Sequence, residues 1–186
     1  MDWKDHVSNA VYLALCKVFG LSPDSDEAMA RFIPAYLEDA TNTQAPRKTN
    51  VVYYALSLMT DTNYDYVQVS HELANNTPKA FVQKTIPVSA LLTFYGKDAD
   101  NDAEMFWSHF QVDEGKGSAR SALRKVNVVP IGKPSRPTII YEVEGTYQRR
   151  RLDVRLNLAY FQTSTSDYGW INTPPAIDIK TNEVDG

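Results

Sequence analysis

Residues 147–161 read YQRRRLDVRLNLAYF, and they carry the sharpest pattern in the 186-residue chain. Apolar and polar side chains alternate along this stretch, as expected for a β-strand with one buried face. The apolar set is Leu152, Val154, Leu156, Leu158 and Tyr160; the polar set is Arg149, Arg151, Asp153, Arg155 and Asn157. A shift of one residue in the strand pairing would exchange the two faces, so the register of this strand is strongly specified.

The polar face of this strand is the most functional-looking feature of the sequence. We interpret Arg149, Arg151, Asp153 and Arg155 as a candidate inter-subunit interface, because guanidinium groups bind carboxylates of a neighbouring subunit in bidentate fashion. Two other interpretations stay open, a solvated outer face and a contact with DNA. The net charge of −4 weakens the DNA interpretation.

Four further strands are predicted from aromatic, β-branched or alternating segments, at residues 51–59, 64–73, 80–95 and 138–144. In the third of these, Pro87 cannot donate to a neighbouring strand, which predicts an edge position or a bulge. Ile139, Tyr141 and Val143 share one face of the last.

Helices are predicted at residues 3–19, 25–33, 98–111 and 118–125, where apolar residues recur at spacings of three and four. Gly20 ends the first helix, and Ser118 caps the last. In the second helix, Met29, Phe32 and Ile33 are expected to point inward.

This order of elements predicts an α+β fold, a mostly antiparallel sheet with helices packed on it. We expect a single domain over residues 1–186, with N-terminal helices in 1–37, a sheet-and-helix core in 51–162 and an extended tail in 163–186. Residues 38–50 are polar and are predicted to form a loop.

Composition narrows the class of protein. A pI of about 5.4 gives no general reason to expect binding to DNA or to anionic membranes. No apolar run is long enough to span a bilayer, the N-terminus lacks the features of a signal peptide, and Cys16 is the single cysteine. We therefore expect assembly in the cytoplasm.

No metal site is predicted from the sequence. His6, His71 and His109 are far apart and in no ligand spacing. Residues 98–102 have the D-x-D-x-D opening of a calcium loop, but Ala103 replaces the required glycine and His109 the bidentate glutamate. An acidic helix start is the better interpretation.

Catalytic and cofactor motifs are also missing. Residues 115–118 lack the spacing of a phosphate-binding loop, and Cys16 lies within a helix with no basic neighbour in sequence to activate it. We expect no catalytic residue, no metal and no cofactor, and hence no enzymatic activity.

Several short segments, in their order and spacing, resemble a known family. They are Ile33-Pro34-Ala35-Tyr36, the proline-bearing loop through Arg47, Val51-Val52-Tyr53-Tyr54, Phe94-Tyr95-Gly96, the acidic helix 98–111, and residues 147–154. Together they cover roughly residues 30–172. In this order they resemble phage neck terminator proteins and, more distantly, the tail terminators of long-tailed phages.

The resemblance implies a structural virion protein that forms a ring, usually a hexamer, at the head-proximal end of the tail. Such a ring terminates the tail tube, joins it to the neck or connector proteins, and lets DNA pass without specific binding. No catalytic residue is carried over from the family. The tail 163–186 and the loop 38–50 are where contacts between rings are expected, because they lack regular structure.

Two alternatives remain beside the ring. One is another virion component, such as a head-tail connector, head-completion or baseplate protein. The other is a small enzyme whose site is built from residues distant in sequence, which would show a pocket with perturbed titratable groups.

Overall fold

The computed structural model describes residues 3–35, 49–59, 67–74, 77–111, 118–144 and 147–167. At residues 70–74, 77–81, 144, 147–149 and 165–167 it describes the backbone alone. Contacts divide the chain into two compact units, Met1–Tyr66 with Lys84–Gln162 and Val67–Gln83 with Thr163–Gly186. The predicted loop 38–50 lies almost wholly outside the described residues, as does the tail beyond residue 167. The predicted division of the chain stays a prediction.

The strands form a mixed sheet. They are β1 (Phe32–Pro34), β2 (Val51–Leu58), β3 (Val67–Ala74), β4 (Thr77–Tyr95), β5 (Val128–Pro130), β6 (Thr138–Glu144) and β7 (Tyr147–Asp167). Over the described residues the order is β1-β2-β4-β7-β5, with β3 beside β4 and β6 beside β7. β1 runs parallel to β2, whereas the pairs β2–β4, β5–β7 and β6–β7 are antiparallel.

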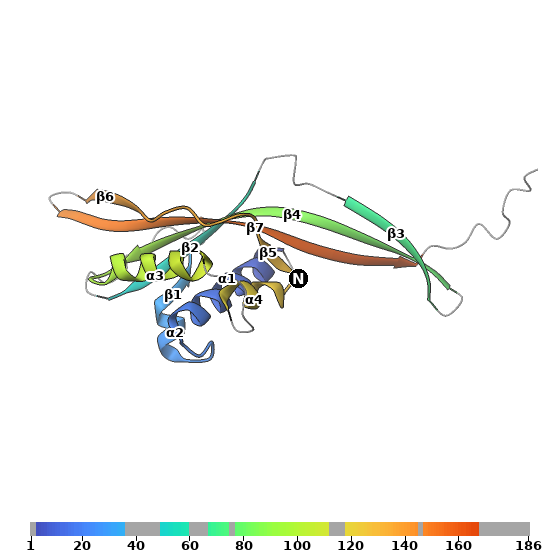
Figure 1. Ribbon diagram of the computed structural model, residues 1–186, viewed down its shortest axis with the longest axis horizontal. Helices are drawn as coiled ribbons and strands as arrows, with labels where there is room; N and C mark the ends of the chain where they lie inside the picture. Colours follow the sequence, from blue (N-terminus) through green and yellow to red (C-terminus); the bar gives the residue numbers. More distant parts are fainter. Residues whose placement is uncertain are drawn as a thin grey trace, which may run out of the picture. The chain divides into compact units, whose positions relative to one another are not determined.

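The helices are α1 (Trp3–Phe19), α2 (Asp26–Arg31), α3 (Ala99–Gln111) and α4 (Ala119–Arg124). In the first unit, α1, α3 and α4 cover one face of the sheet (Figure 1). These layers confirm the α+β fold class. None of the helices within the described ranges is long and apolar enough to cross a membrane.

The core lies between these helices and the alternating face of β7. The predicted apolar residues of β7 are all buried, from Val154 and Leu158 at 0% exposed to Tyr160 at 7%. They meet buried residues of β4, among them Leu92 and Phe94, and the rings of Phe106 and Phe110 from α3. The buried face predicted for β7 is confirmed.

Helix ends also follow the predicted chemistry. Gly20 adopts φ +66° after α1, and the N–H of Leu21 donates to Cys16 O at 2.9 Å, a bond that satisfies a carbonyl of the last turn. The Oγ of Ser118 accepts from the N–H of Ser121 at 3.1 Å and so caps α4.

The second predicted helix is too long. α2 ends at Arg31, and Phe32 pairs with Val52 as the first residue of β1. Phe32 is still buried, but in a strand, whereas Met29 is 55% exposed and Ala28 fills the inward position. A three-residue strand that pairs with a distant segment has no local periodicity of its own. The apolar spacing of the helix therefore predicted a helix that extends beyond Arg31.

The edge position expected from Pro87 is wrong, because β4 lies between β2 and β7. The ladder with β2 ends at the pair Leu58↔Val88, and Pro87 O accepts one more bond, from the N–H of Met59 at 3.0 Å. The missing donor of Pro87 therefore falls at the end of the ladder, where it costs least.

Asn50 and Gly96 join β2, β4 and α3. The Oδ1 of Asn50 accepts from the N–H of Asp98 at 3.2 Å, and its Nδ2 donates to Asp98 Oδ2 at 2.7 Å. Gly96 has φ +111°, and a Cβ there would lie 2.7 Å from Asn50 Cα and 2.8 Å from Thr49 O. Both the backbone angle and the space at this turn require glycine.

We expect Gly96→Ala to lower the free energy of unfolding by about 3 kcal/mol, because it adds a backbone clash to a strained angle. Gly132→Ala is the control: Gly132 has φ +74° and open space around its Cβ position, so only about 1 kcal/mol is expected. Urea denaturation monitored by tryptophan fluorescence measures both. Equal losses would show that the contact with Asn50 contributes nothing.

Candidate functional site

The polar face of β7 holds an ion-pair network inside the subunit. The Arg151 guanidinium pairs with Glu142 of β6 and with its neighbour Asp153, whose Oδ1 lies 3.2 Å from Nε and whose Oδ2 accepts from Nη2 at 3.3 Å. The hydroxyl of Tyr95, on β4, donates to Glu142 Oε1 at 3.2 Å. The network therefore links β4, β7 and β6 on the sheet face opposite the helices.

This network stabilises the charged form of Arg151. Its side chain is 26% exposed, and the side chain of Asp153 is 11% exposed. Burial opposes the charged form of Arg151, but Tyr95, Asp153 and Glu142 outweigh it, so the pKa of the guanidinium is raised. Arg151 and Asp153 thus balance each other's charge within one subunit, although the buried Arg151 Nε and Asp153 Oδ1 make no hydrogen bond.

The other two predicted interface residues differ from this pair. Arg155 has an exposed side chain on a fixed backbone: its N–H donates to Ser135 Oγ at 2.8 Å, and its carbonyl accepts from the N–H of Ser135 at 2.8 Å. Arg149 lies opposite Glu142 in the β6–β7 ladder, and its side chain lies outside the described residues. Among Arg151, Asp153 and Arg155, whose side chains the structure describes, Arg155 is the one with an exposed charge.

Arg150 lies on the opposite face of β7, toward α3. Its Nη2 donates to Asp100 Oδ1 at 2.6 Å and its Nη1 donates to Oδ2, so the pair is bidentate. The sequence placed Arg150 in a basic run but outside the polar face. Its partner Asp100 is 50 positions away in the sequence, so no local pattern predicted this pair.

The acidic start of α3 uses its three carboxylates separately. Asp98 binds Asn50, Asp100 binds Arg150, and Asp102 accepts from Arg31 Nη2 at 2.7 Å. Arg31 in turn stacks its guanidinium on Phe19, 4.5 Å from the ring centroid. Each carboxylate therefore anchors α3 to a different part of the chain.

The histidines take separate positions, and no three His, Cys, Asp or Glu side chains gather as metal ligands in the described part of the chain. His6 stacks on Tyr160 with ring centroids 5.4 Å apart, and His109 is exposed on α3. The side chain of His71 lies outside the described residues, and so do residues 115–117.

Cys16 is buried in α1, and burial raises the pKa of its thiol. The pKa of the neighbouring Tyr12 phenol is raised to about 12; burial is the largest cause, and the electrostatic interaction with Cys16 is the next. A thiol held in its neutral form is a poor nucleophile.

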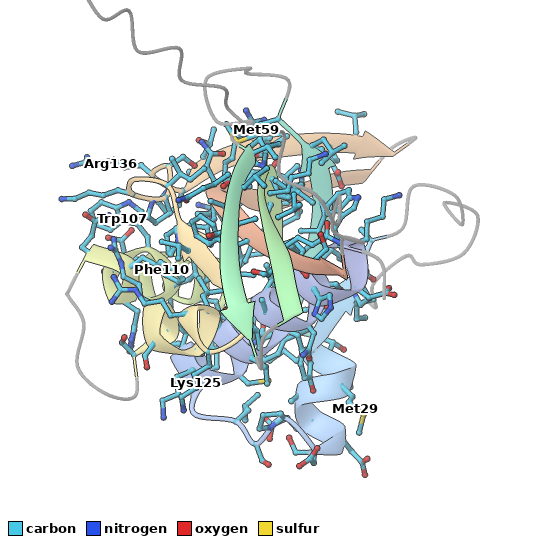
Figure 2. The ribbon with its side chains drawn as sticks, turned by 90° about the vertical axis from the view of Figure 1, so that its right-hand side faces the viewer. Met29, Met59, Trp107, Phe110, Lys125 and Arg136 are labelled. Carbon is cyan, nitrogen blue, oxygen red and sulfur yellow. The ribbon has the colours of Figure 1, made fainter. Side chains whose placement is uncertain are left out.

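A groove of about 530 Å³ lies between α3 and β6. Its apolar lining is Trp107, Ile139, Leu152 and Pro137, and its polar lining is Asp100, Asn101, Glu104 and Arg136. The Arg136 guanidinium lies over the Trp107 ring at 5.6 Å; Figure 2 labels both residues on the same side of the molecule.

Three apolar side chains of β6 continue outward from this groove. Ile139 is 47% exposed, Tyr141 63% and Val143 72%. We call these three residues the β6 row. The sequence showed that they share a face, but it could not show that no helix covers it.

We expect Arg151→Ala to lower the free energy of unfolding by about 1–2 kcal/mol, because it leaves Glu142 and the buried Asp153 without their counter-ion. Arg155→Ala is the matched control; with an exposed side chain it is expected to change stability by less than about 0.5 kcal/mol. Chemical denaturation of both variants tests this. A loss as large for Arg155→Ala would mean that the two arginines are not distinguished by the network.

Comparison with protein families gives a match that covers most of the chain. The family described as phage neck terminator protein matches residues 21–184. Comparison with curated proteins finds no match. The matched span contains α2, α3, α4 and the whole described sheet. The chain thus belongs to the phage neck terminator protein family and is a structural protein of the phage neck, within the virion.

Proposed function

We propose that this protein assembles into a closed ring, a hexamer, at the head-proximal end of the tail, where it terminates the tail tube and joins it to the neck. The observation that carries the proposal is the family match over residues 21–184. The partners are other copies of the chain, the tail tube protein and the neck or connector proteins.

The surface of the subunit supports assembly by heterologous contacts. A cyclic ring needs two different patches on each subunit, each meeting the other on the next copy. Arg155 on the outer face of β7 and the β6 row on the helix side could each form one half of such a contact, with a different surface of the next copy as the other half. An exposed arginine suits a carboxylate, and an exposed apolar row suits burial.

The charge of the chain supports a passive relation to DNA. At a net charge of −4, a ring of six copies repels the phosphate backbone and lets DNA slide through without specific binding. We place assembly of this ring in the host cytoplasm, before or during joining of head and tail.

We also propose that the protein acts without catalysis. The carboxylates that open α3 are each engaged by a different partner, and the Cys16 thiol is buried with a raised pKa. The carboxylates hold α3 to the rest of the fold, and a buried thiol with a raised pKa is a poor nucleophile.

Negative-stain microscopy and light scattering of the purified full chain test the ring. Six-fold particles with a central hole and a mass of six subunits are expected at tens of micromolar. A mass of one subunit at that concentration, unchanged when tail tubes are added, would contradict the proposal.

Arg155→Glu is expected to weaken the oligomer without lowering the melting temperature, because it reverses an exposed charge at the proposed contact. Lys97→Glu makes the same charge change at a side chain that is 80% exposed and serves as the control. Size-exclusion chromatography across a dilution series compares them. An Arg155→Glu protein that assembles like Lys97→Glu would leave Arg155 as solvated surface.

A further inference from the structure

The β6 row lies at the edge of the helix-side face of the sheet, and its side chains are exposed. In the antiparallel register, Ile139 lies opposite Leu152 and Tyr141 opposite Arg150, so the row shares its face with the core residues of β7. The exposed fraction of the side chain is 4% at Leu152, on β7, and along the β6 row it rises from 47% at Ile139 to 72% at Val143. The apolar face of the core therefore continues outward beyond the end of α3.

The strand that carries the row is an edge. Over the described residues β6 pairs with β7 on one side, and its other side has no strand. Residues 138–144 read TIIYEVE, with no proline or lysine; the two glutamates lie on the opposite face, and the three side chains of the β6 row are uncharged. In natural proteins, proline or lysine on an edge strand, or a segment that covers it, usually prevents another strand from pairing with it. An open apolar edge without this protection accepts an added strand.

The chain itself contains a segment that fits this edge. Nineteen residues, 168–186, follow the end of β7, and residues 174–180 read PPAIDIK. Ile177 and Ile179 are two apart, the period that places both on one face of a strand. Pro174 and Pro175 disfavour a helical conformation of the residue that precedes each of them.

The match lies on the face of the β6 row. In an added strand, Ile177 and Ile179 would lie beside the β6 row and remove its apolar surface from water. Asp178 and Lys180 would then share the other face, where Glu142 is already paired with Arg151, so apolar burial and backbone hydrogen bonds would supply the affinity. In the tail sequence after residue 167, these are the two isoleucines that lie two positions apart.

We infer that the edge of β6 and the β6 row bind residues 176–180 of a neighbouring copy as an added β-strand. The inference rests on the proposed ring: a tail on one side and an open edge on the other form a heterologous contact, which propagates from copy to copy. The contact would let each subunit of the ring hold the next through backbone hydrogen bonds and apolar burial.

Disulfide trapping between two full-length single-site variants tests this contact. One carries Tyr141→Cys, and the other carries Ile179→Cys and a size tag. The native Cys16 is buried and is retained. After mixing and mild oxidation, the mixed dimer is expected on a non-reducing gel. Val67→Cys is the control partner, because Val67 is also apolar and 53% exposed on a strand, but in β3.

A second variant measures the contribution of the segment to assembly. Ile177→Asp with Ile179→Asp is expected to raise the concentration of half-assembly by about tenfold or more, since two apolar side chains lose their burial. Asn172→Asp with Thr173→Asp adds the same two charges to the same tail and is expected to leave assembly nearly unchanged.

The outcomes separate this contact from the ring itself. Rings that form without the mixed disulfide, and that are equally stable in both double variants, overturn the inference and leave the ring intact. A disulfide that forms only within a chain carrying both cysteines overturns the assignment to a neighbouring copy. Protection of Tyr141→Cys from thiol reagents by added tail tubes alone assigns the row to the tube instead. A full chain that never assembles overturns the ring.

Discussion

The two-faced register of β7 is the constraint on which the rest of the structure depends. Its helix side contributes Leu152, Val154, Leu156 and Leu158 to the core, and a slip of one residue would expose all four and bury charged groups. The same register places Arg151 and Asp153 on the other side, where Arg151 pairs with both Asp153 and Glu142, and Glu142 accepts a hydrogen bond from Tyr95. Packing on one face and ion pairing on the other therefore select a single alignment of β7 with its neighbours.

The helix layer is fixed onto this sheet by polar groups at the start of α3. Asp98, Asp100 and Asp102 reach Asn50, Arg150 and Arg31, which lie beside β2, on β7 and on α2. Each bond alone is worth little at a partly exposed site. Together they orient the helix along the sheet, and apolar packing of Phe106 and Phe110 supplies most of the stabilisation. The carboxylates that resemble a calcium loop in sequence thus attach α3 to the rest of the fold.

Sequence reasoning succeeded where the signal was local. The alternation of β7, the stripe of α3 and the caps at Gly20 and Ser118 each depend on neighbours within a few positions. It failed where the decisive partner is distant: Phe32 leaves a helical pattern to pair with Val52, and Arg150 finds Asp100 across 50 positions. The candidate interface shows the same division. Its residues and their common face were predicted, but the engagement of Arg151 by Glu142 and the exposure of the β6 row depend on three-dimensional neighbours.

This division bears on how a ring subunit can stay folded alone and still assemble. Buried ion pairs contribute little net affinity between proteins because desolvation cancels much of their attraction, so charges already satisfied inside one subunit are poor sources of assembly energy. Arg151 and Asp153 are satisfied in this way, whereas the β6 row leaves apolar surface in water until a neighbour covers it. Apolar burial at an open edge then supplies affinity, and an exposed charge such as Arg155 supplies orientation. An edge strand also restricts the partner to an extended segment of matching period, which makes the contact specific without a preformed deep pocket.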